Sequence, residues 1–228
     1  MSTPSVPEKQ KSLIILQTSE FELLNWKGWS EFPNMVRIRT IPDGSCFFHA
    51  IANAYFLPYR TGLLDGKAMS KRDIIAGFRH DLSKMLAMPI DPRDPEGPTH
   101  YDTLSHGKLA EFAKGHPEYT LANMQKQLNS NSSVDNIYVE FISNQLNLDI
   151  YLLDLNKQEV YITGKDDDLY FKNRNSIVIG YLPGHYELIG LYNAITKEVS
   201  TYFKPSHPFI TNIRKRLTEI RDKGEKDE

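Results

Sequence analysis

The residue best suited to covalent chemistry is Cys46, the only cysteine of the chain. It follows Asp43-Gly44, a strong turn dipeptide, and Pro42, which fixes its own φ angle. Apolar residues recur at helical spacing from Cys46 onward, which predicts that the cysteine lies in the first turn of a helix entering the core. There the positive end of the helix dipole favours a thiolate, the reactive form of cysteine.

The backbone N–H groups of this turn are a second chemical feature. Those of Asp43, Gly44, Ser45 and Cys46 are predicted to form an oxyanion hole, which stabilises the negative charge of a tetrahedral intermediate. The alternative is that Cys46 is a small core residue, because free cysteine is among the most buried residue types. A turn rich in backbone donors directly before the cysteine favours the catalytic interpretation.

A nucleophilic cysteine needs a base within hydrogen-bond reach and a group that orients the base. His185 follows a Pro-Gly turn at the start of a predicted strand, and Glu187, two residues later, shares its face of that strand. Glu187 is therefore predicted to hold one ring nitrogen while the other faces the thiol. The main rival is His49, one helical turn after Cys46, but its apolar neighbours favour a structural role.

The helices and strands that must position these residues are distributed unevenly along the chain, with mainly helices in the first part and mainly strands in the second. Helices are predicted from Cys46 onward and over residues 70–88, 102–114, 120–128, 134–146 and 209–221. Strands are predicted over residues 35–41, 149–155, 160–163, 176–182 and 185–191, a Pro-rich loop over 89–100, a helix or loop over 21–29, and disorder over 1–11. Helices followed mainly by antiparallel strands indicate an α+β fold.

The length of 228 residues suits one well-packed domain. We expect an N-terminal arm over residues 1–30, partly disordered, then a catalytic domain over 31–195, and a C-terminal helix with a charged tail over 196–228.

The composition restricts partners and compartment. Lysine and arginine number 27 against 29 acidic residues, so no net field favours a nucleic acid or a membrane surface as partner. No run approaches the roughly 18 apolar residues of a membrane span, and no signal peptide is visible. A single cysteine excludes an internal disulfide and a multi-cysteine zinc site. We therefore expect a cytoplasmic protein in a reducing compartment.

Two blocks carry a resemblance to a known family. Asp43-Gly44-Ser45-Cys46-Phe47-Phe48 before an apolar helix, together with Gly184-His185-Tyr186-Glu187 on a late strand, resembles the ovarian-tumour (OTU) family of cysteine proteases. The likeness covers roughly residues 38–191 in the order of elements. It implies a single papain-like OTU domain with helices flanking a small, mostly antiparallel sheet. It also implies a deubiquitinase that cuts the (iso)peptide bond after the C-terminal glycine of ubiquitin, polyubiquitin or a ubiquitin-like modifier.

The resemblance also implies residue roles. Cys46 is the nucleophile, His185 the general base, and Asp43 the loop aspartate that supports the oxyanion-hole turn. Glu187 stands where Asp or Asn is usual in the family. Ser45 stands where Asn is common, and we expect this difference to matter less, because the backbone at this position is what counts. This chemistry needs no metal and no cofactor.

Three residues near the histidine are candidates for substrate binding. Tyr181, Leu182 and Tyr186 are predicted to wall a narrow channel for the Gly-Gly tail of ubiquitin, although aromatic packing accounts for them equally well. Two other functions are the alternatives. One is a non-catalytic ubiquitin-binding module with an OTU fold, against which the intact Cys46 and His185 argue. The other is a cysteine hydrolase of a different family, against which the absence of a papain-type or caspase-type block counts.

Overall fold

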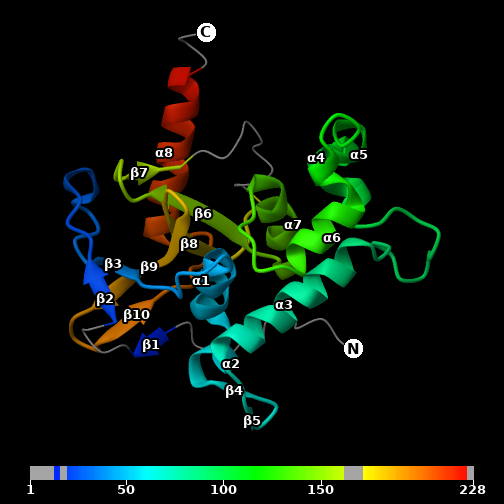
Figure 1. Cartoon of the computed structure of the whole chain (residues 1–228). Coiled ribbons are helices and arrows are strands. Elements are labelled where there is room, and N and C mark those ends of the chain that lie inside the picture. Colours follow the sequence, from blue (N-terminus) through cyan, green and yellow to red (C-terminus); the bar gives the residue numbers. More distant parts are fainter. Residues whose placement is uncertain (1–12, 16–19, 162–171, 225–228) are drawn as a thin grey trace.

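The two segments that carry the motifs belong to a helix and a strand packed against each other (Figure 1). The computed structural model describes residues 13–15, 20–161 and 172–224. Helix α1 (Cys46–Tyr55) begins at the cysteine, and strand β9 (His185–Asn193) begins at the histidine. Both starts agree with the sequence prediction.

A mostly antiparallel sheet forms the centre of the described part of the chain. Its strands run in the order β1-β10-β9-β8-β6-β7, while β3 pairs with β9 and β2 pairs with β3. Every pair is antiparallel except β6 with β8, which is parallel. The strands are β1 (Leu13–Ile15), β2 (Phe21–Leu23), β3 (Met35–Ile38), β6 (Asp149–Asp154), β7 (Glu159–Val160), β8 (Ser176–Leu182), β9 and β10 (Glu198–Ser200). The predicted α+β class is confirmed.

Helices and short turns surround this sheet. The helices after α1 are α2 (Leu57–Thr61), α3 (Lys71–Leu86), α4 (Leu104–Gly107), α5 (Leu109–Phe112), α6 (Leu121–Leu128), α7 (Asn136–Leu146) and α8 (Pro208–Gly224). Single 3-10 turns are η1 (Lys27–Trp29), η2 (Tyr101–Thr103) and η3 (Pro117–Tyr119), and β4 (Leu63–Leu64) pairs with β5 (Lys67–Ala68). Figure 1 shows α3 beside α1, with α6 and α7 packed on α3.

The sheet is buried on both faces, because successive residues of a strand point to opposite sides. Leu188 of β9 belongs to the core that contains Phe48 of α1. Its neighbour Ile189 belongs to a second core that contains Phe209 of α8. This explains why the middle of β8 (residues 177–179) and the middle of β9 (residues 188–191) are continuous apolar runs rather than alternating ones.

The predicted helix over residues 102–114 is wrong as a single element. The chain forms η2, α4 and α5 there, because Ser105 and His106 have φ angles of 52° and 55° and Gly107 follows with 78°. Left-handed backbone interrupts a right-handed helix, and it is stabilised here by the Ser105 N–H, which donates to the carboxylate of Glu140 at 3.1 Å.

The ends of the chain contribute to the same sheet. Segment 21–29, predicted as helix or loop, contains β2, which pairs with β3. Strand β10, which was not predicted, pairs with both β1 and β9. The predicted disorder over 1–11 and the end of the predicted strand over 160–163 lie outside the described residues. The domain boundaries at residues 30 and 195 stay a prediction.

Among the described residues, no helix is both long and apolar enough to cross a membrane.

Candidate active site

The turn before α1 is closed by its own hydrogen bonds. The Asp43 N–H donates to Ile41 O at 2.9 Å, and the Cys46 N–H donates to Asp43 O at 3.1 Å. The Ser45 N–H donates to Oδ1 of Asp43 at 2.9 Å. Gly44 is the residue of the turn whose N–H has no acceptor among the described residues. The N–H groups of Asp43, Ser45 and Cys46 therefore have acceptors within the turn, whereas that of Gly44 has none among the described residues, and the oxyanion hole stays a prediction.

The thiol of Cys46 lies against the first residues of β9. Cys46 is 3% exposed, and the backbone N–H groups of Tyr186 and Phe47 are directed at its sulfur. Burial raises the pKa of the thiol above its ordinary value of 9.0, and these N–H groups offset the effect only in part. The expected stabilisation of a thiolate by the helix N-terminus is thus outweighed by desolvation, and the resting thiol is protonated at neutral pH.

His185 directly precedes Tyr186, whose backbone N–H faces the Cys46 thiol. Its Nε2 is 3.7 Å from Oε1 of Glu187, which confirms that the two side chains share a face of β9. This separation exceeds a hydrogen bond, so the contact is an ion pair when the imidazole is protonated. Among the described residues, Nδ1 of His185 makes no hydrogen bond. The ring therefore keeps one nitrogen available, and its side chain is 24% exposed.

The start of β9 is fixed against α1 on both sides of Tyr186. The hydroxyl of Thr40, in the lead-in to the cysteine turn, donates to Tyr186 O at 2.5 Å. The ring of Tyr186 packs edge-on against Phe47, with centroids 5.3 Å apart. These contacts bring the segments of Cys46 and His185, which are distant in the sequence, to one end of the sheet.

The carboxylate of Asp43 is held on the far side of the turn. Its Oδ2 lies 3.4 Å from Nε2 of His49 and 3.5 Å from Nε of Arg72. Partial burial raises the pKa of Asp43, but the Ser45 N–H and these neighbours outweigh it, and the net shift is downward. His49 is fully buried, and its Nδ1 lies 2.8 Å from the hydroxyl of Tyr59. Its ring thus braces Asp43, which agrees with the expected structural role.

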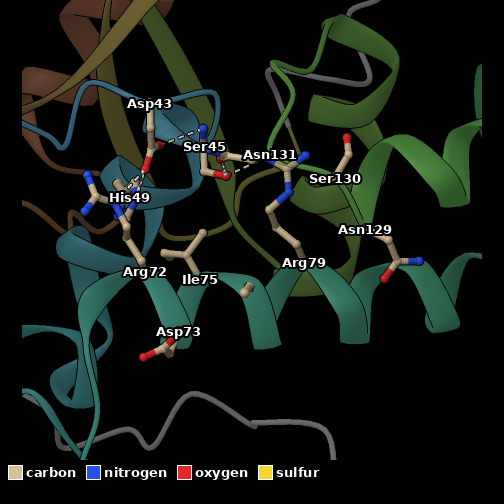
Figure 2. Close-up of a pocket in the computed structure, with 11 residues that line it drawn as sticks. Asp43, Ser45, His49, Arg72, Asp73, Ile75, Arg79, Asn129, Ser130 and Asn131 are labelled. Atoms are coloured by element: carbon tan, nitrogen blue, oxygen red, sulfur yellow. Dashed lines mark hydrogen bonds and ion pairs between the residues drawn. The ribbon is translucent and has the colours of Figure 1, made fainter.

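A polar cavity of about 270 Å³ lies behind the turn, between it and α3 (Figure 2). The hydroxyl of Ser45 donates to Oδ1 of Asn131 at 2.7 Å and accepts from Nη1 of Arg79 at 2.8 Å. The side chain of Ser45 therefore has hydrogen bonds of its own, in addition to the backbone role that the sequence predicts. The hydroxyl joins three segments, because it is short enough to fit between Arg79 and the 129–133 loop.

Arg79 was not among the predicted site residues. It is 2% exposed, and its guanidinium also donates to the carbonyls of Leu128, Gln127 and Ser132 at 2.8 to 2.9 Å. Burial lowers its pKa to about 10, so it remains charged at neutral pH. The available signal was its position four residues after Ile75, on the apolar face of the predicted 70–88 helix.

Comparisons with known proteins give likenesses in structure alone. An ovarian-tumour (OTU) domain solved in complex with ubiquitin is 18% identical, with 92% of this chain and 98% of that chain covered and a TM-score of 0.46. The Hazara virus OTU bound to ubiquitin is 14% identical, with 70% and 83% covered and a TM-score of 0.37. The viral OTU domain protease from Farallon virus is 16% identical, with 76% and 97% covered and a TM-score of 0.36. No protein-family model and no curated protein sequence matches the chain.

The three predicted substrate-binding residues lie at the same end of the sheet as His185. Leu182 stands opposite His185 in the β8–β9 ladder, and Tyr181 stands opposite Tyr186. The rings of Tyr181 and Tyr186 are 5.5 Å apart, and Tyr161 adds a third ring 4.9 Å from Tyr181. All three predicted residues are half-buried, and their role as channel walls stays a prediction.

Over residues 13–15, 20–161 and 172–224, no three His, Cys, Asp or Glu side chains are grouped as metal ligands.

Proposed function

We propose that this chain is a cysteine protease of the OTU type, which hydrolyses the (iso)peptide bond after the C-terminal glycine of ubiquitin. One observation carries the catalytic part of the proposal. The Cys46 thiol faces the Tyr186 N–H, and the adjoining residue, His185, contacts a buried carboxylate. The substrate class rests on the sequence blocks around Cys46 and His185.

In the first step, His185 acts as general base. Because the resting thiol is protonated, the imidazole must accept its proton as Sγ attacks the carbonyl carbon of the terminal glycine. The new C–S bond converts the carbonyl to a tetrahedral oxyanion. The Gly44 N–H is the donor of the turn that is available to stabilise this charge.

In the second step, the imidazolium of His185 donates its proton to the departing amine, and the C–N bond breaks. A thioester between Cys46 and ubiquitin remains. Water then loses a proton to the imidazole and attacks the thioester carbonyl, which releases the ubiquitin carboxylate and restores the thiol. No metal and no cofactor takes part in these steps.

The C-terminal tail of the substrate is proposed to approach along Tyr181, Leu182 and Tyr186. A Gly-Gly tail fits a narrow passage because it has no side chains. Polyubiquitin and ubiquitin-like modifiers with such a tail are included in the proposal.

The test is a panel of diubiquitins incubated with the wild-type chain, with Cys46→Ala and with His185→Ala. We expect the wild type to cleave at least one linkage and Cys46→Ala to cleave none. A ubiquitin probe with a C-terminal electrophile should label Cys46, the sole cysteine. Ubiquitin binding without labelling would instead indicate a non-catalytic module. Cleavage of short peptides but of no diubiquitin would indicate a different cysteine hydrolase.

A further inference from the structure

The carboxylate of Glu187 lies between two basic side chains, those of His185 and Arg37. Its Oε1 faces His185, and its Oε2 lies 3.4 Å from Nη1 of Arg37. The Glu187 side chain is only 8% exposed, and Oε2 is buried without any hydrogen bond. An ionised carboxylate in such a place needs a compensating charge, because removing it from water is unfavourable.

Arg37 is placed for this contact by the sheet. Strand β3 is antiparallel to β9, and Arg37 stands opposite Ile189. Ile189 is two residues after Glu187, so Arg37 and Glu187 lie on the same face of the sheet. The remaining side of the guanidinium is bound to Glu22, which stands opposite Arg37 on β2. Nε and Nη2 donate to Oε2 of Glu22 at 2.9 and 2.6 Å. Glu22 thus fixes the guanidinium, and Nη1 is directed at Glu187.

We infer that Arg37 is a positioning residue for the reaction, acting through Glu187 on His185. Glutamate is one methylene longer than the Asp or Asn usual in OTU proteases, and here its two oxygens reach both Arg37 and His185. Arg37 places a positive charge beside the buried carboxylate of Glu187 and fixes the plane of that carboxylate, which in turn orients the imidazole toward Cys46. This inference rests on the proposed function for the role of His185.

A double-mutant cycle tests whether Arg37 acts through Glu187. The variants are Arg37→Met, which keeps the length and removes the charge, Glu187→Gln, and the two combined. Turnover is measured with a fluorogenic substrate that carries ubiquitin on the leaving group. We expect Arg37→Met to lower kcat about tenfold with KM within about twofold. The double variant should be no slower than Glu187→Gln alone, whereas a purely structural role would make the losses multiply.

A second measurement needs no ubiquitin. Iodoacetamide alkylates the sole cysteine, so its rate by mass spectrometry reports the reactivity of Cys46 directly. At about pH 8 most of the thiol is protonated, and the His185 imidazole is proposed to accept its proton as sulfur attacks the iodoacetamide. We therefore expect the order wild type, then Arg37→Met, then Glu187→Gln, with His185→Ala slowest. If the wild type and His185→Ala react equally fast, the inference and the proposed base both fail. If Glu187→Gln slows alkylation and Arg37→Met does not, the inference fails while the proposed function stands.

Two further variants separate positioning from loss of folding. Arg39→Met removes an exposed arginine that contacts no carboxylate among the described residues, and both rates should stay at the wild-type level. Glu22→Gln removes the charge of the exposed partner and leaves Arg37 intact. Glu22→Gln should also lower kcat, but by less than Arg37→Met does. An Arg39→Met loss equal to that of Arg37→Met would overturn the inference.

Discussion

Gly44 lies directly against the backbone of Asn131. A Cβ added to Gly44 would stand 1.9 Å from Asn131 O and 2.7 Å from its carbonyl carbon, far inside the van der Waals limit. The Asn131 side chain at the same time accepts the hydrogen bond of the Ser45 hydroxyl. The conformation of the cysteine turn is therefore set by a loop that comes from a different part of the chain.

Substitution of Gly44 should therefore separate the two segments. We expect Gly44→Ala to lower kcat/KM at least tenfold and to reduce the free energy of unfolding by about 1–3 kcal/mol. The reason is that neither the backbone of the turn nor that of Asn131 can move aside easily. Gly77→Ala is the matched control, since a Cβ on that exposed residue of α3 meets no atom within 4 Å. It should stabilise the helix by about 1 kcal/mol. Wild-type turnover in Gly44→Ala would show that the contact does not shape the site.

Removal of the Ser45 hydroxyl should weaken the same junction. Ser45→Ala leaves an N–H of buried Arg79 and the Oδ1 of Asn131 without this partner, which is expected to reduce the free energy of unfolding by about 1–3 kcal/mol. Urea denaturation measures the change. Ser132→Ala is the control, because its exposed hydroxyl bonds only that of Ser130, and it should stay within about 0.5 kcal/mol of wild type. Equal stability of Ser45→Ala and Ser132→Ala would contradict this assignment.

Loss of the Thr40 hydroxyl should reduce activity more than stability. Thr40→Val keeps the shape of the side chain but removes its hydrogen bond to Tyr186 O, which fixes the start of β9 beside the thiol. We expect kcat to fall by about threefold to tenfold, while the free energy of unfolding decreases by only about 1 kcal/mol. Thr61→Val is the control, because Thr61 is exposed and its hydroxyl donates to the carbonyl of Leu57 within α2, away from β9. An equal loss of kcat in Thr40→Val and Thr61→Val would contradict the prediction.

The sequence predicted the elements that local patterns specify. The turn chemistry of Asp43-Gly44 located the start of α1, and the Pro-Gly turn located the start of β9. Ser70 was identified as the cap of α3, and its hydroxyl accepts from the Asp73 N–H at 3.1 Å. These features depend on neighbours in the chain, so a single sequence contains them.

The features that the sequence did not reveal depend on contacts between distant segments. The break at Ser105 is stabilised by Glu140, and nothing near Ser105 in the sequence indicates this partner. The contact of Arg37 with Glu187 requires β3 to lie beside β9 in one register. The raised pKa of Cys46 follows from its burial in the folded chain, which the helix-dipole argument ignored.

The buried imidazole of His49 should make stability depend on pH. Burial lowers the pKa of His49 below its ordinary value of 6.5, and Asp43 opposes this only in part. Below about pH 6.5 the unfolded chain therefore binds a proton that the folded chain does not, so the free energy of unfolding falls as the pH falls. His49→Gln, which cannot be protonated, should lose less stability than wild type between about pH 7.5 and about pH 5.

Urea denaturation at both pH values checks this prediction. His100 and His207, whose pKa values are also lowered by burial, are present in both proteins and cancel in the comparison. An identical pH dependence in the wild type and in His49→Gln would mean that His49 binds its proton as readily in the folded chain as in the unfolded chain, which would contradict the prediction.

The reactivity of Cys46 should rise steeply at alkaline pH in the absence of substrate. Burial raises the pKa of the thiol above 9.0, so only a small fraction is thiolate at neutral pH. The second-order rate of alkylation by iodoacetamide should therefore climb from about pH 7 to beyond about pH 9, as the thiol loses its proton. A thiolate–imidazolium pair formed in advance would instead give a nearly constant rate over this range. Such a plateau would restore the prediction based on the helix dipole, and it would move the proton transfer to His185 ahead of substrate binding.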